Sequence, residues 1–369
     1  MRKVKIAVVA GARPNFMKVA PLISELNKIG AFDTVLVHTG QHYDREMSAI
    51  FFKELGLPAP DKYLGGGSAS HAVQTARVME ALEKYFLKLR PDLAVVVGDV
   101  NSTLAASVVC SKMLIPVAHV EAGLRSFDRT MPEEINRIVT DSLSSYLFTT
   151  SPEARINLLK EGAKPAAIYF TGNVMIDTLK KLKKAAERRN TLAEMELNKN
   201  GYALLTLHRP SNVDDRESFV KIIKALKYIS TKLTVVFPAH PRTVKQLSKF
   251  GLAGLLKGAD IRLIKPAGYL DFLNLMANSK FVLTDSGGIQ EETTVLGIPC
   301  LTLRNNTERP ITVSQGTNLL VGGESSAISA AADKILNNSF KKAKIPRFWD
   351  GKAAVRIASI LKREFSNRK

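Results

Sequence analysis

Short apolar, β-branched runs alternate with longer amphipathic stretches along most of this chain, and this alternation is the feature that most constrains its fold. Strands that alternate with helices form parallel sheets that are covered by helices on both faces. The runs fall into two series, which predicts an α/β protein of two Rossmann-like, doubly wound domains. The runs expected to form strands are residues 6–9, 34–38, 93–97 and 116–120 in the first series, and 203–207, 233–237, 261–264, 281–284 and 300–303 in the second.

The length and composition of the chain agree with a globular protein of two domains. It has 369 residues, of which 45% are hydrophobic, and this is enough for a sizeable core. A polar region at residues 171–200, rich in Lys, Arg and Glu, marks the expected join. We predict an N-terminal domain of residues 1–172 and a C-terminal domain of residues 173–350, followed by a last helix within residues 351–369.

The chain shows no sign of a membrane or secretory protein. No apolar run is long enough to span a bilayer, and the N-terminus lacks the apolar region and cleavage site of a signal peptide. Cys110 and Cys300 stand far apart in apolar contexts, which is typical of reduced thiols in a protein core. We therefore expect a cytoplasmic protein with no membrane insertion.

The formal net charge of +19 is unusually high for a protein of this size. Three explanations are open: nucleic-acid binding, an anionic substrate attracted into a positive cleft, or a Lys-rich solvated surface. Much of the excess lies in stretches such as residues 180–189 and 341–347, which lack interleaved aromatic residues. Such stretches are typical of solvated faces, so we expect no nucleic-acid partner.

Polar and charged residues follow the ends of many of the predicted strands. In the first series they lie at residues 11–15, 98–102 and 119–125, and in the second series His208 and His240 each follow a strand. Ligands bind a doubly wound sheet beyond the carboxyl ends of its strands. A lone His or Asp there is usually a cap or a loop residue. So many reactive groups at one edge of both domains instead predict a functional cleft between the domains.

Residues 285–292, with the sequence Asp-Ser-Gly-Gly-Ile-Gln-Glu-Glu, connect a predicted strand to a helix. The glycines let the backbone approach a ligand closely, and the N–H groups at a helix start favour a phosphate. An acidic residue in the first turns could accept ribose hydroxyls. No Gly-Lys-Ser/Thr follows, so the segment is not a P-loop. Alone, it predicts either a nucleotide-diphosphate site or an ordinary tight turn.

The order and spacing of these motifs resemble those of the non-hydrolysing UDP-N-acetylglucosamine 2-epimerases over nearly the whole chain. The resemblance implies a GT-B-like fold, a UDP-sugar substrate, a homodimer, and a last helix that returns to the N-terminal domain. It implies neither a cofactor nor a metal ion. The motifs that carry it are Gly-Ala-Arg-Pro at 11–14, Gly-Gln-His at 40–42, Gly-Asp at 98–99, His-Val-Glu-Ala-Gly-Leu-Arg at 119–125, Met-Pro-Glu-Glu-Ile-Asn-Arg at 131–137, Leu-His-Arg at 207–209, residues 285–292, and Thr-Glu-Arg-Pro at 307–310.

The resemblance also implies roles for individual residues. Asp99, Glu121 and Glu133 would be the acid and base carboxylates near C2 of the sugar, while His208 would assist the departure of UDP. Which carboxylate takes the proton and which returns it stays open. The substrate-binding residues would be Arg13, Lys18, Arg137, His240, Phe272, Ser286, Gly287, Gly288, Glu292 and Arg309, and a candidate second, allosteric site would include Gln41, His42 and Arg77.

Some of these roles have structural alternatives. Arg137 lies one helical turn beyond Glu133, so it either keeps that carboxylate ionised at the site or forms an ordinary i, i+4 ion pair with it. Arg309 either binds the diphosphate or pairs with Glu308 at the surface. Glu292 either accepts the ribose hydroxyls or is an exposed helix carboxylate. The sequence leaves each choice open.

The chemistry of 2-epimerisation sets its own requirements. C2 of a 2-acetamido sugar has no adjacent carbonyl, so its proton becomes acidic only if UDP leaves C1 and positive charge develops there. Elimination then gives a planar glycal that can be reprotonated on the opposite face. This route needs cations and amides on the diphosphate and carboxylates around C2, but no NAD. We therefore expect reversible 2-epimerisation of UDP-N-acetylglucosamine to UDP-N-acetylmannosamine, supplying cell-surface polysaccharide synthesis.

Three other activities compete with this expectation. The first is 2-epimerisation of a modified UDP-2-acetamido sugar, because the Ser-Phe-Asp sequence at residues 126–128 also occurs in relatives that act on such sugars. The second is a hydrolysing 2-epimerase, which would release free sugar and UDP. The third is a GT-B glycosyltransferase, which commonly has an amphipathic patch that docks on a membrane; the sequence shows no convincing one.

Overall fold

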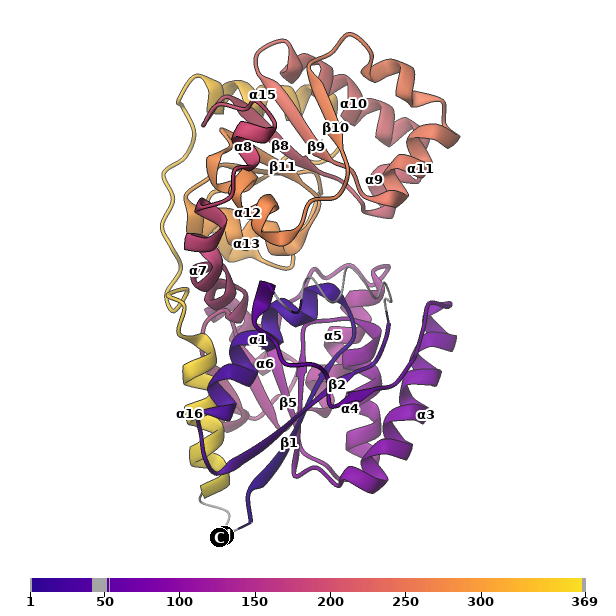
Figure 1. Ribbon diagram of the computed structural model, residues 1–369, viewed down its shortest axis with the longest axis vertical. Helices are drawn as coiled ribbons and strands as arrows, with labels where there is room; N and C mark the ends of the chain where they lie inside the picture. The colour runs from indigo at the N-terminus through magenta and orange to yellow at the C-terminus, as the bar shows by residue number, and fades with distance from the viewer. Residues whose placement is uncertain (1, 42–51, 53, 367–369) are drawn as a thin grey trace. The chain divides into compact units, whose positions relative to one another are not determined.

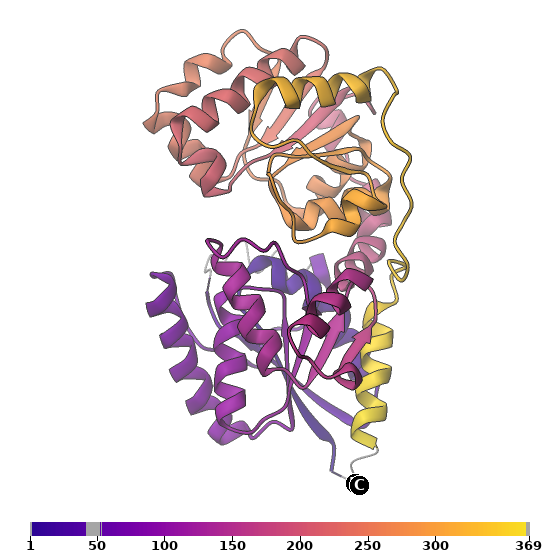
Figure 2. The same ribbon diagram turned by 180° about the vertical axis from the view of Figure 1, so that it is seen from behind.

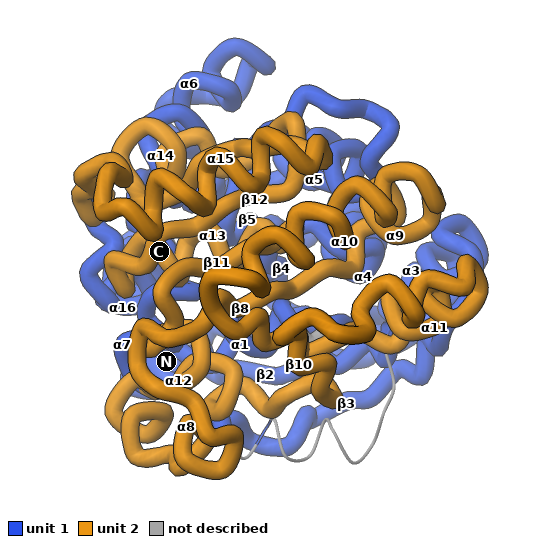
Figure 3. The backbone as a smooth tube through the Cα atoms, turned by 90° about the horizontal axis from the view of Figure 1, so that it is seen from above, with its two compact units in different colours: residues 1–181, 347–369 blue, residues 182–346 orange. Residues whose placement is uncertain are grey.

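The computed structural model describes residues 2–41, 52 and 54–366 (Figure 1). It divides into two compact units, which Figure 3 colours separately. The chain first passes from one unit to the other within α7 (Val174–Glu187). Unit 1 comprises residues 1–181 and 347–369, and unit 2 comprises residues 182–346.

Unit 1 is built on a seven-stranded parallel sheet with the strand order β3-β2-β1-β4-β5-β6-β7. Its central strand β4, with the sequence LAVVV, is buried at every position, as expected where helices cover a parallel sheet on both faces. The strands are β1 (Val4–Ala10), β2 (Phe32–His38), β3 (Lys62–Tyr63), β4 (Leu93–Val97), β5 (Val117–Ala122), β6 (Tyr146–Thr149) and β7 (Ile168–Phe170). The helices are α1 (Arg13–Asn27), α3 (His71–Leu89), α4 (Asn101–Lys112), α5 (Pro132–Leu143), α6 (Pro152–Lys160) and α16 (Ala353–Ser366), with the 3₁₀ turn η1 (Pro165–Ala167).

Unit 2 has a six-stranded parallel sheet with the order β10-β9-β8-β11-β12-β13. Its core contains Phe219 from α10, Phe237 from β9 and Phe281 from β11. The strands are β8 (Tyr202–Thr206), β9 (Thr234–Pro238), β10 (Ile261–Ile264), β11 (Phe281–Thr284), β12 (Cys300–Thr302) and β13 (Asn318–Leu320). The helices are α8 (Thr191–Glu194), α9 (Pro210–Val213), α10 (Arg216–Ser230), α11 (Pro241–Lys249), α12 (Tyr269–Asn278), α13 (Gly287–Leu296), α14 (Pro310–Ser314) and α15 (Ser325–Leu336), with the 3₁₀ turn η2 (Leu252–Leu256).

In both sheets the first strand of the unit lies inside the sheet, and the chain winds outward from it first on one side and then on the other. This is the Rossmann-like order, so the prediction of two doubly wound α/β domains is confirmed. Strands β3, β6, β7 and β13 lie outside the predicted runs. They have only two to four residues each, which is too short for a clear periodic pattern.

Helix α3 shows how the sequence determines a local element. Ser70 caps its first turn by accepting the N–H of Val73, and Arg90 ends the helix in a left-handed conformation. Val78, Leu82 and their helical neighbours form the buried face. The exposed face carries charged residues together with Val73 and Leu87. In the part of the chain that the structure describes, no helix is both long and apolar enough to cross a membrane.

The C-terminal helix α16 belongs to unit 1, where it packs against α1 (Figures 1 and 2). The preceding segment is anchored by Trp349, which is 1% exposed and donates its indole N–H to the Thr150 carbonyl oxygen at 2.9 Å. The Asp177 carboxylate of α7 caps α16 by accepting the N–H groups of Ala353 at 3.1 Å and Ala354 at 2.7 Å. Residues about 175 positions apart in the chain thereby hold each other in place.

Asp177 should make the stability of unit 1 depend on pH. Burial raises its pKa from the usual 3.8 to about 6, against the opposing effect of the two N–H groups that it accepts. The carboxyl group therefore favours folding below about pH 4, and this contribution is lost as the pH rises through 6. Between pH 4 and 7, we expect the unfolding free energy of the wild type to fall by roughly 3 kcal/mol relative to Asp177→Asn. Urea unfolding at several pH values measures this difference, and parallel pH curves for the two proteins would contradict it.

Candidate active site

Lys18, Asp99 and Glu121 lie at the carboxyl edge of the sheet in unit 1. Lys18 is on α1, Asp99 follows β4, and Glu121 lies near the end of β5. The pairing of β5 with β6 shifts its register between Val120 and Ala122, and Glu121 has a φ of 80°. A left-handed Glu inside a strand is strained, by about 1–3 kcal/mol. Such irregularities re-aim a side chain, and they occur most often next to functional sites.

Lys18 and Glu121 form a buried ion pair. Lys18 is 5% exposed and Glu121 is 4% exposed. Each charged group has lost its water on burial, and the opposite charge of its partner compensates for that loss. The end of the Lys18 side chain lies against the backbone at Gly98. A Cβ atom on Gly98 would lie 2.8 Å from Lys18 Nζ, and Gly98 has a φ of 67°. Lys18, expected as a substrate-binding residue, thus contacts a carboxylate of the protein itself.

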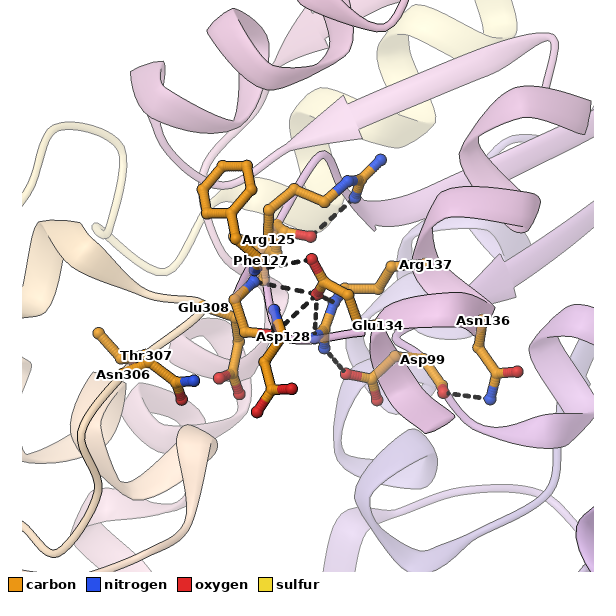
Figure 4. Close-up of polar contacts among 12 residues, drawn as sticks. Asp99, Arg125, Phe127, Asp128, Glu134, Asn136, Arg137, Asn306, Thr307 and Glu308 are labelled. Atoms are coloured by element: carbon orange, nitrogen blue, oxygen red, sulfur yellow. Dashed lines mark hydrogen bonds and ion pairs between the residues drawn. The ribbon is translucent and has the colours of Figure 1, made fainter. Parts of the chain in front are cut away.

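Arg137 connects Asp99 to Glu134, and not to Glu133 as the sequence suggested (Figure 4). Its Nη1 atom lies 2.5 Å from Asp99 Oδ2, and its Nη2 atom lies 2.6 Å from Glu134 Oε2. The predicted i, i+4 pair with Glu133 is therefore wrong. Successive helical residues point about 100° apart, and in α5 it is Glu134 that faces the interior.

Glu134 was not recognised from the sequence, although it holds the loop before α5. Its carboxylate accepts the N–H groups of Ser126 and Phe127, both at 2.9 Å (Figure 4). Burial raises its pKa, but these bonds and Arg137 outweigh that effect, so the pKa lies below its usual value. Its sequence signal is an acidic residue in the first turn of a helix, three positions before an Arg. Glu133, by contrast, is half-buried and makes no hydrogen bond or ion pair with any described residue.

Of the residues proposed for a second site, Gln41 is buried and supports the protein itself. Its side-chain oxygen accepts the N–H of Ser102 at 3.2 Å and the hydroxyl of the same residue at 2.8 Å. Its backbone carbonyl accepts from Gln74 Nε2. Arg77 is exposed on α3. His42 lies outside the described residues, as does the side chain of Arg13.

In unit 2, Asp285 at the end of β11 orients His208, which follows β8. Asp285 is 0% exposed, and its Oδ1 atom lies 2.9 Å from Nδ1 of the half-exposed His208 ring. It also accepts the backbone N–H groups of His208 and Arg209 at 3.0 and 2.8 Å. Burial raises the pKa of Asp285, but His208 and the backbone N–H groups lower it by more. The pKa therefore lies below its usual value, and the carboxyl stays ionised. The sequence placed Asp285 in an important motif without assigning it this role.

His240 is close to His208, with ring centroids 5.9 Å apart. Its Nδ1 accepts the N–H of Arg242 at 3.2 Å, so it also caps α11. His240 therefore has a structural role as the cap of α11. The two rings nevertheless lie side by side at the carboxyl ends of neighbouring strands, β8 and β9.

Helix α13 begins at Gly287, with Ser286 as its N-cap residue and Gly288 in its first turn. Ten residues of helix place a row of N–H groups and the positive dipole end at this point. A Cβ on Gly287 would lie 2.3 Å from Arg309 Nη1 and 2.6 Å from Glu308 Oε1. The absence of a side chain at Gly287 therefore leaves room for the guanidinium of Arg309 as well as for a phosphate.

Arg309 is buried among charged side chains. It pairs with Glu308, but this pair is buried and does not lie at the surface. Arg309 is 5% exposed, it pairs with Glu308, and its Nε lies 2.8 Å from Glu291 Oε1. Arg304 approaches the second oxygen of Glu308 at 2.9 Å. The guanidinium is thus fixed beside the start of α13, with the carboxylates of Glu308 and Glu291 against it.

Glu292 is 5% exposed, which excludes the alternative of an exposed helix carboxylate. Tyr269 of α12 donates its hydroxyl to Glu292 Oε1 at 2.7 Å. Burial raises the pKa of Glu292 to about 7; Tyr269 counteracts this effect and Glu291 reinforces it. Phe272, proposed to stack on uracil, is half-buried one turn after Tyr269 on the same helix. Tyr269 itself was missed, and only its place at a helix start could have pointed to it.

Comparisons with known proteins show to which family the chain belongs. Residues 24–362 match the family model described as UDP-N-acetylglucosamine 2-epimerase. The protein of that name from Methanocaldococcus jannaschii is 45% identical over 363 residues, covering 97% of this chain and 98% of the relative. The chain belongs to the UDP-N-acetylglucosamine 2-epimerase family. As a member of this epimerase family it is an isomerase.

Two further members of the epimerase family are informative. A crystal structure of the M. jannaschii UDP-GlcNAc 2-epimerase in complex with UDP-GlcNAc and UDP is 44% identical, with a TM-score of 0.91, and the match covers 98% of this chain and all of that one. A Pseudomonas aeruginosa UDP-2,3-diacetamido-2,3-dideoxy-D-glucuronate 2-epimerase is 39% identical over 97% of this chain and 99% of its own. The family thus includes members named for more than one UDP-sugar.

The Lys18–Glu121 pair should show strong coupling in a double-mutant cycle. Lys18→Met leaves a buried carboxylate without its cation, so we expect it to lower the unfolding free energy by about 3–5 kcal/mol. Adding Glu121→Gln should recover part of that loss, because the second change removes the isolated charge. Lys28 and Glu25 form an exposed pair on α1, and Lys28→Met as a control should change stability by less than about 1 kcal/mol. Urea unfolding measures Lys18→Met, Glu121→Gln, the double variant and the control Lys28→Met; additive effects at Lys18 and Glu121 would contradict the coupling.

Proposed function

We propose that this protein interconverts UDP-N-acetylglucosamine and UDP-N-acetylmannosamine without net hydrolysis. The single observation that carries the proposal is the set of carboxylates in unit 1, Asp99, Glu121 and Glu133, at the edge of a Rossmann-like sheet. Two of them have a cation against them, Arg137 and Lys18 respectively. Membership of the family and the bound UDP-GlcNAc and UDP of the M. jannaschii relative support the choice of substrate.

The proposed reaction is an elimination followed by an addition. A carboxylate of unit 1 takes the proton from C2, the C1–O bond to UDP breaks with its electron pair leaving on the phosphate oxygen, and a C1–C2 double bond forms. The same phosphate oxygen then adds back to C1, while C2 receives a proton on its opposite face. Atoms and electrons balance without an added oxidant or reductant. Asp99 and Glu121 each touch a cation, whereas Glu133 has no described partner; which carboxylate takes the proton and which returns it stays open.

Unit 2 has the groups that the leaving UDP requires. The N-terminus of α13 at Ser286, Gly287 and Gly288 offers N–H groups to the diphosphate. Arg309 lies beside that helix end, paired with Glu308 and Glu291, and is the proposed guanidinium contact to the diphosphate. His208, held by Asp285 through Nδ1, is the proposed proton donor or hydrogen-bond donor to the departing oxygen. Retention of UDP is what would make the reaction an epimerisation, and the product would serve cell-surface polysaccharide synthesis.

Incubation with UDP-N-acetylglucosamine in deuterated water tests the proposal. We expect deuterium at C2 and a mixture of the two UDP-sugars, measured by NMR. Asp99→Asn should abolish exchange while UDP binding, measured by calorimetry, stays within about twofold of wild type. Asp33→Asn, an exposed residue of the same sheet, is the matched control and should react like the wild type.

The other outcomes of that experiment are equally specific. Free N-acetylmannosamine and UDP would show a hydrolysing enzyme and would overturn the proposed retention of UDP. No exchange with UDP-N-acetylglucosamine, but exchange with a UDP-2,3-diacetamido sugar, would show that the substrate is the one named for the P. aeruginosa relative. Full activity of Asp99→Asn would contradict the role of that carboxylate.

Glu292 should make UDP binding depend on pH. If its carboxylate accepts the ribose hydroxyls, the ionised form binds best, and with a pKa of about 7 this form is lost as the pH falls from 8 to 6. We expect the affinity for UDP to drop about tenfold over that range, beyond any change shown by Glu292→Gln. Tyr269→Phe removes a donor to the carboxylate, so it should move the midpoint to higher pH. Calorimetry at several pH values measures both effects; identical pH profiles for wild type and Glu292→Gln would contradict them.

A further inference from the structure

A buried group of charges lies behind the carboxyl edge of unit 1, outside the residues discussed above. It consists of His119 on β5, Asp141 on α5 and Arg125 in the loop after β5. Their exposures are 0%, 4% and 3%. These three side chains have no role in the proposed reaction. A buried ionic group is costly, so its presence calls for a physical reason.

Asp141 lies at the centre of this group. Its Oδ1 atom is 2.6 Å from His119 Nδ1, and its Oδ2 atom accepts the N–H of Gly123 at 3.0 Å. Arg125 Nη2 lies 2.7 Å from the same Oδ2, and Arg125 also binds Glu161, with its Nε 2.8 Å from Oε1. Burial raises the pKa of Asp141, but His119 and Arg125 outweigh burial and keep the carboxyl ionised. Both of its oxygens are therefore engaged as acceptors.

His119 continues the chain of contacts toward Asp99. Its Nε2 atom lies 2.9 Å from the carbonyl oxygen of Gly98, the residue immediately before Asp99. A carbonyl oxygen only accepts hydrogen bonds, so Nε2 must be the donor. Nδ1 faces an ionised carboxylate and must donate as well. The ring therefore links Asp141 to Gly98 through its two nitrogen atoms.

The two ends of this link are the two turns that carry the candidate carboxylates. Gly98 has a φ of 67° and leads directly into Asp99. Gly123 has a φ of 78° and follows Glu121, whose own φ is 80°. Glycine adopts such a conformation readily, but a left-handed Glu121 persists only where its surroundings over-determine it. Asp141 bonds to one turn directly and to the other through His119, so a single carboxylate ties the two turns together.

We propose that His119 and Asp141 are a positioning pair for the epimerisation, which sets the separation between Asp99 and Glu121 from behind the sheet edge. The inference rests on the proposed roles of Asp99 and Glu121 in proton transfer at C2. Neither member of the pair touches the substrate. Catalysis by oriented groups is sensitive to displacement, and a shift of about 1 Å can cost about 100-fold in rate. Loss of the link should therefore lower kcat far more than it raises KM.

Two substitutions of His119 separate its two hydrogen bonds. The amide nitrogen of His119→Gln can reach the place of Nε2 and donate to Gly98, whereas that of His119→Asn can reach only the place of Nδ1 and donate to Asp141. Both variants remove the ring and should lose similar stability. We expect His119→Asn to lose about 100-fold in kcat with KM changed less than about threefold, and His119→Gln to lose only about tenfold.

Asp141→Asn tests the other end of the link. It keeps the shape of the side chain but removes the charge that His119 and Arg125 require, so we expect a kcat loss similar to that of His119→Asn. Asp177→Asn is the matched control, because Asp177 is also a buried carboxylate of unit 1 that accepts two backbone N–H groups, yet it caps α16. It should lose stability and keep its kcat. Urea unfolding and UDP calorimetry show that each variant is folded.

The outcomes separate this inference from the proposed function. If the wild type neither exchanges the C2 proton nor epimerises a UDP-sugar, the proposed function fails. If the wild type is active and His119→Asn retains its kcat while folded, the positioning role is wrong. A larger kcat loss in His119→Gln, which keeps a donor to Gly98, than in His119→Asn would also overturn it, because the bond to Gly98 would then be irrelevant. If Asp177→Asn loses as much kcat as Asp141→Asn, the loss in both reflects lower stability and not positioning, and the inference is wrong.

Discussion

Carboxylates are buried at the ends of β5, β11 and α5, and the arrangement of both sheet edges depends on how their charge is compensated. An ionised carboxylate out of water is tolerated only where cations or N–H groups replace its hydration. Glu121 has Lys18, Asp285 has His208 and backbone N–H groups, and Asp141 has three donors. Because the compensating groups come from other elements, each carboxylate fixes how those elements dock.

Glycines and left-handed residues make this compensation possible. Gly98 leaves room for Lys18 Nζ, and Gly287 leaves room for the guanidinium of Arg309. In a nucleotide-binding protein such glycines are usually explained by the close approach of a phosphate. Here the same positions also admit a cation of the protein itself. Close packing and ligand binding therefore constrain the same residues, and a substitution at Gly287 would disturb both.

The sequence was sufficient to predict the candidate site at the level of segments but not at the level of pairs. The residues after β4, β5, β8 and β11 were recognised because strand ends in a doubly wound fold meet at one edge. Arg137 was paired with the wrong neighbour, because Glu133 and Glu134 both fit helical spacing. His119 and Asp141 are 22 residues apart on a strand and a helix, so no local pattern joins them.

The sequence alone determined that the chain forms two Rossmann-like sheets and which segments lie at their carboxyl edges, because strand and helix periodicities are local properties of the chain. Only the tertiary structure decided which charges neutralise one another. It paired Arg137 with Asp99 and Glu134, buried Arg309, and left Glu133 without a described partner. The physical reason is that ion pairs depend on distances between elements remote in sequence, and those distances are set by how the whole core packs.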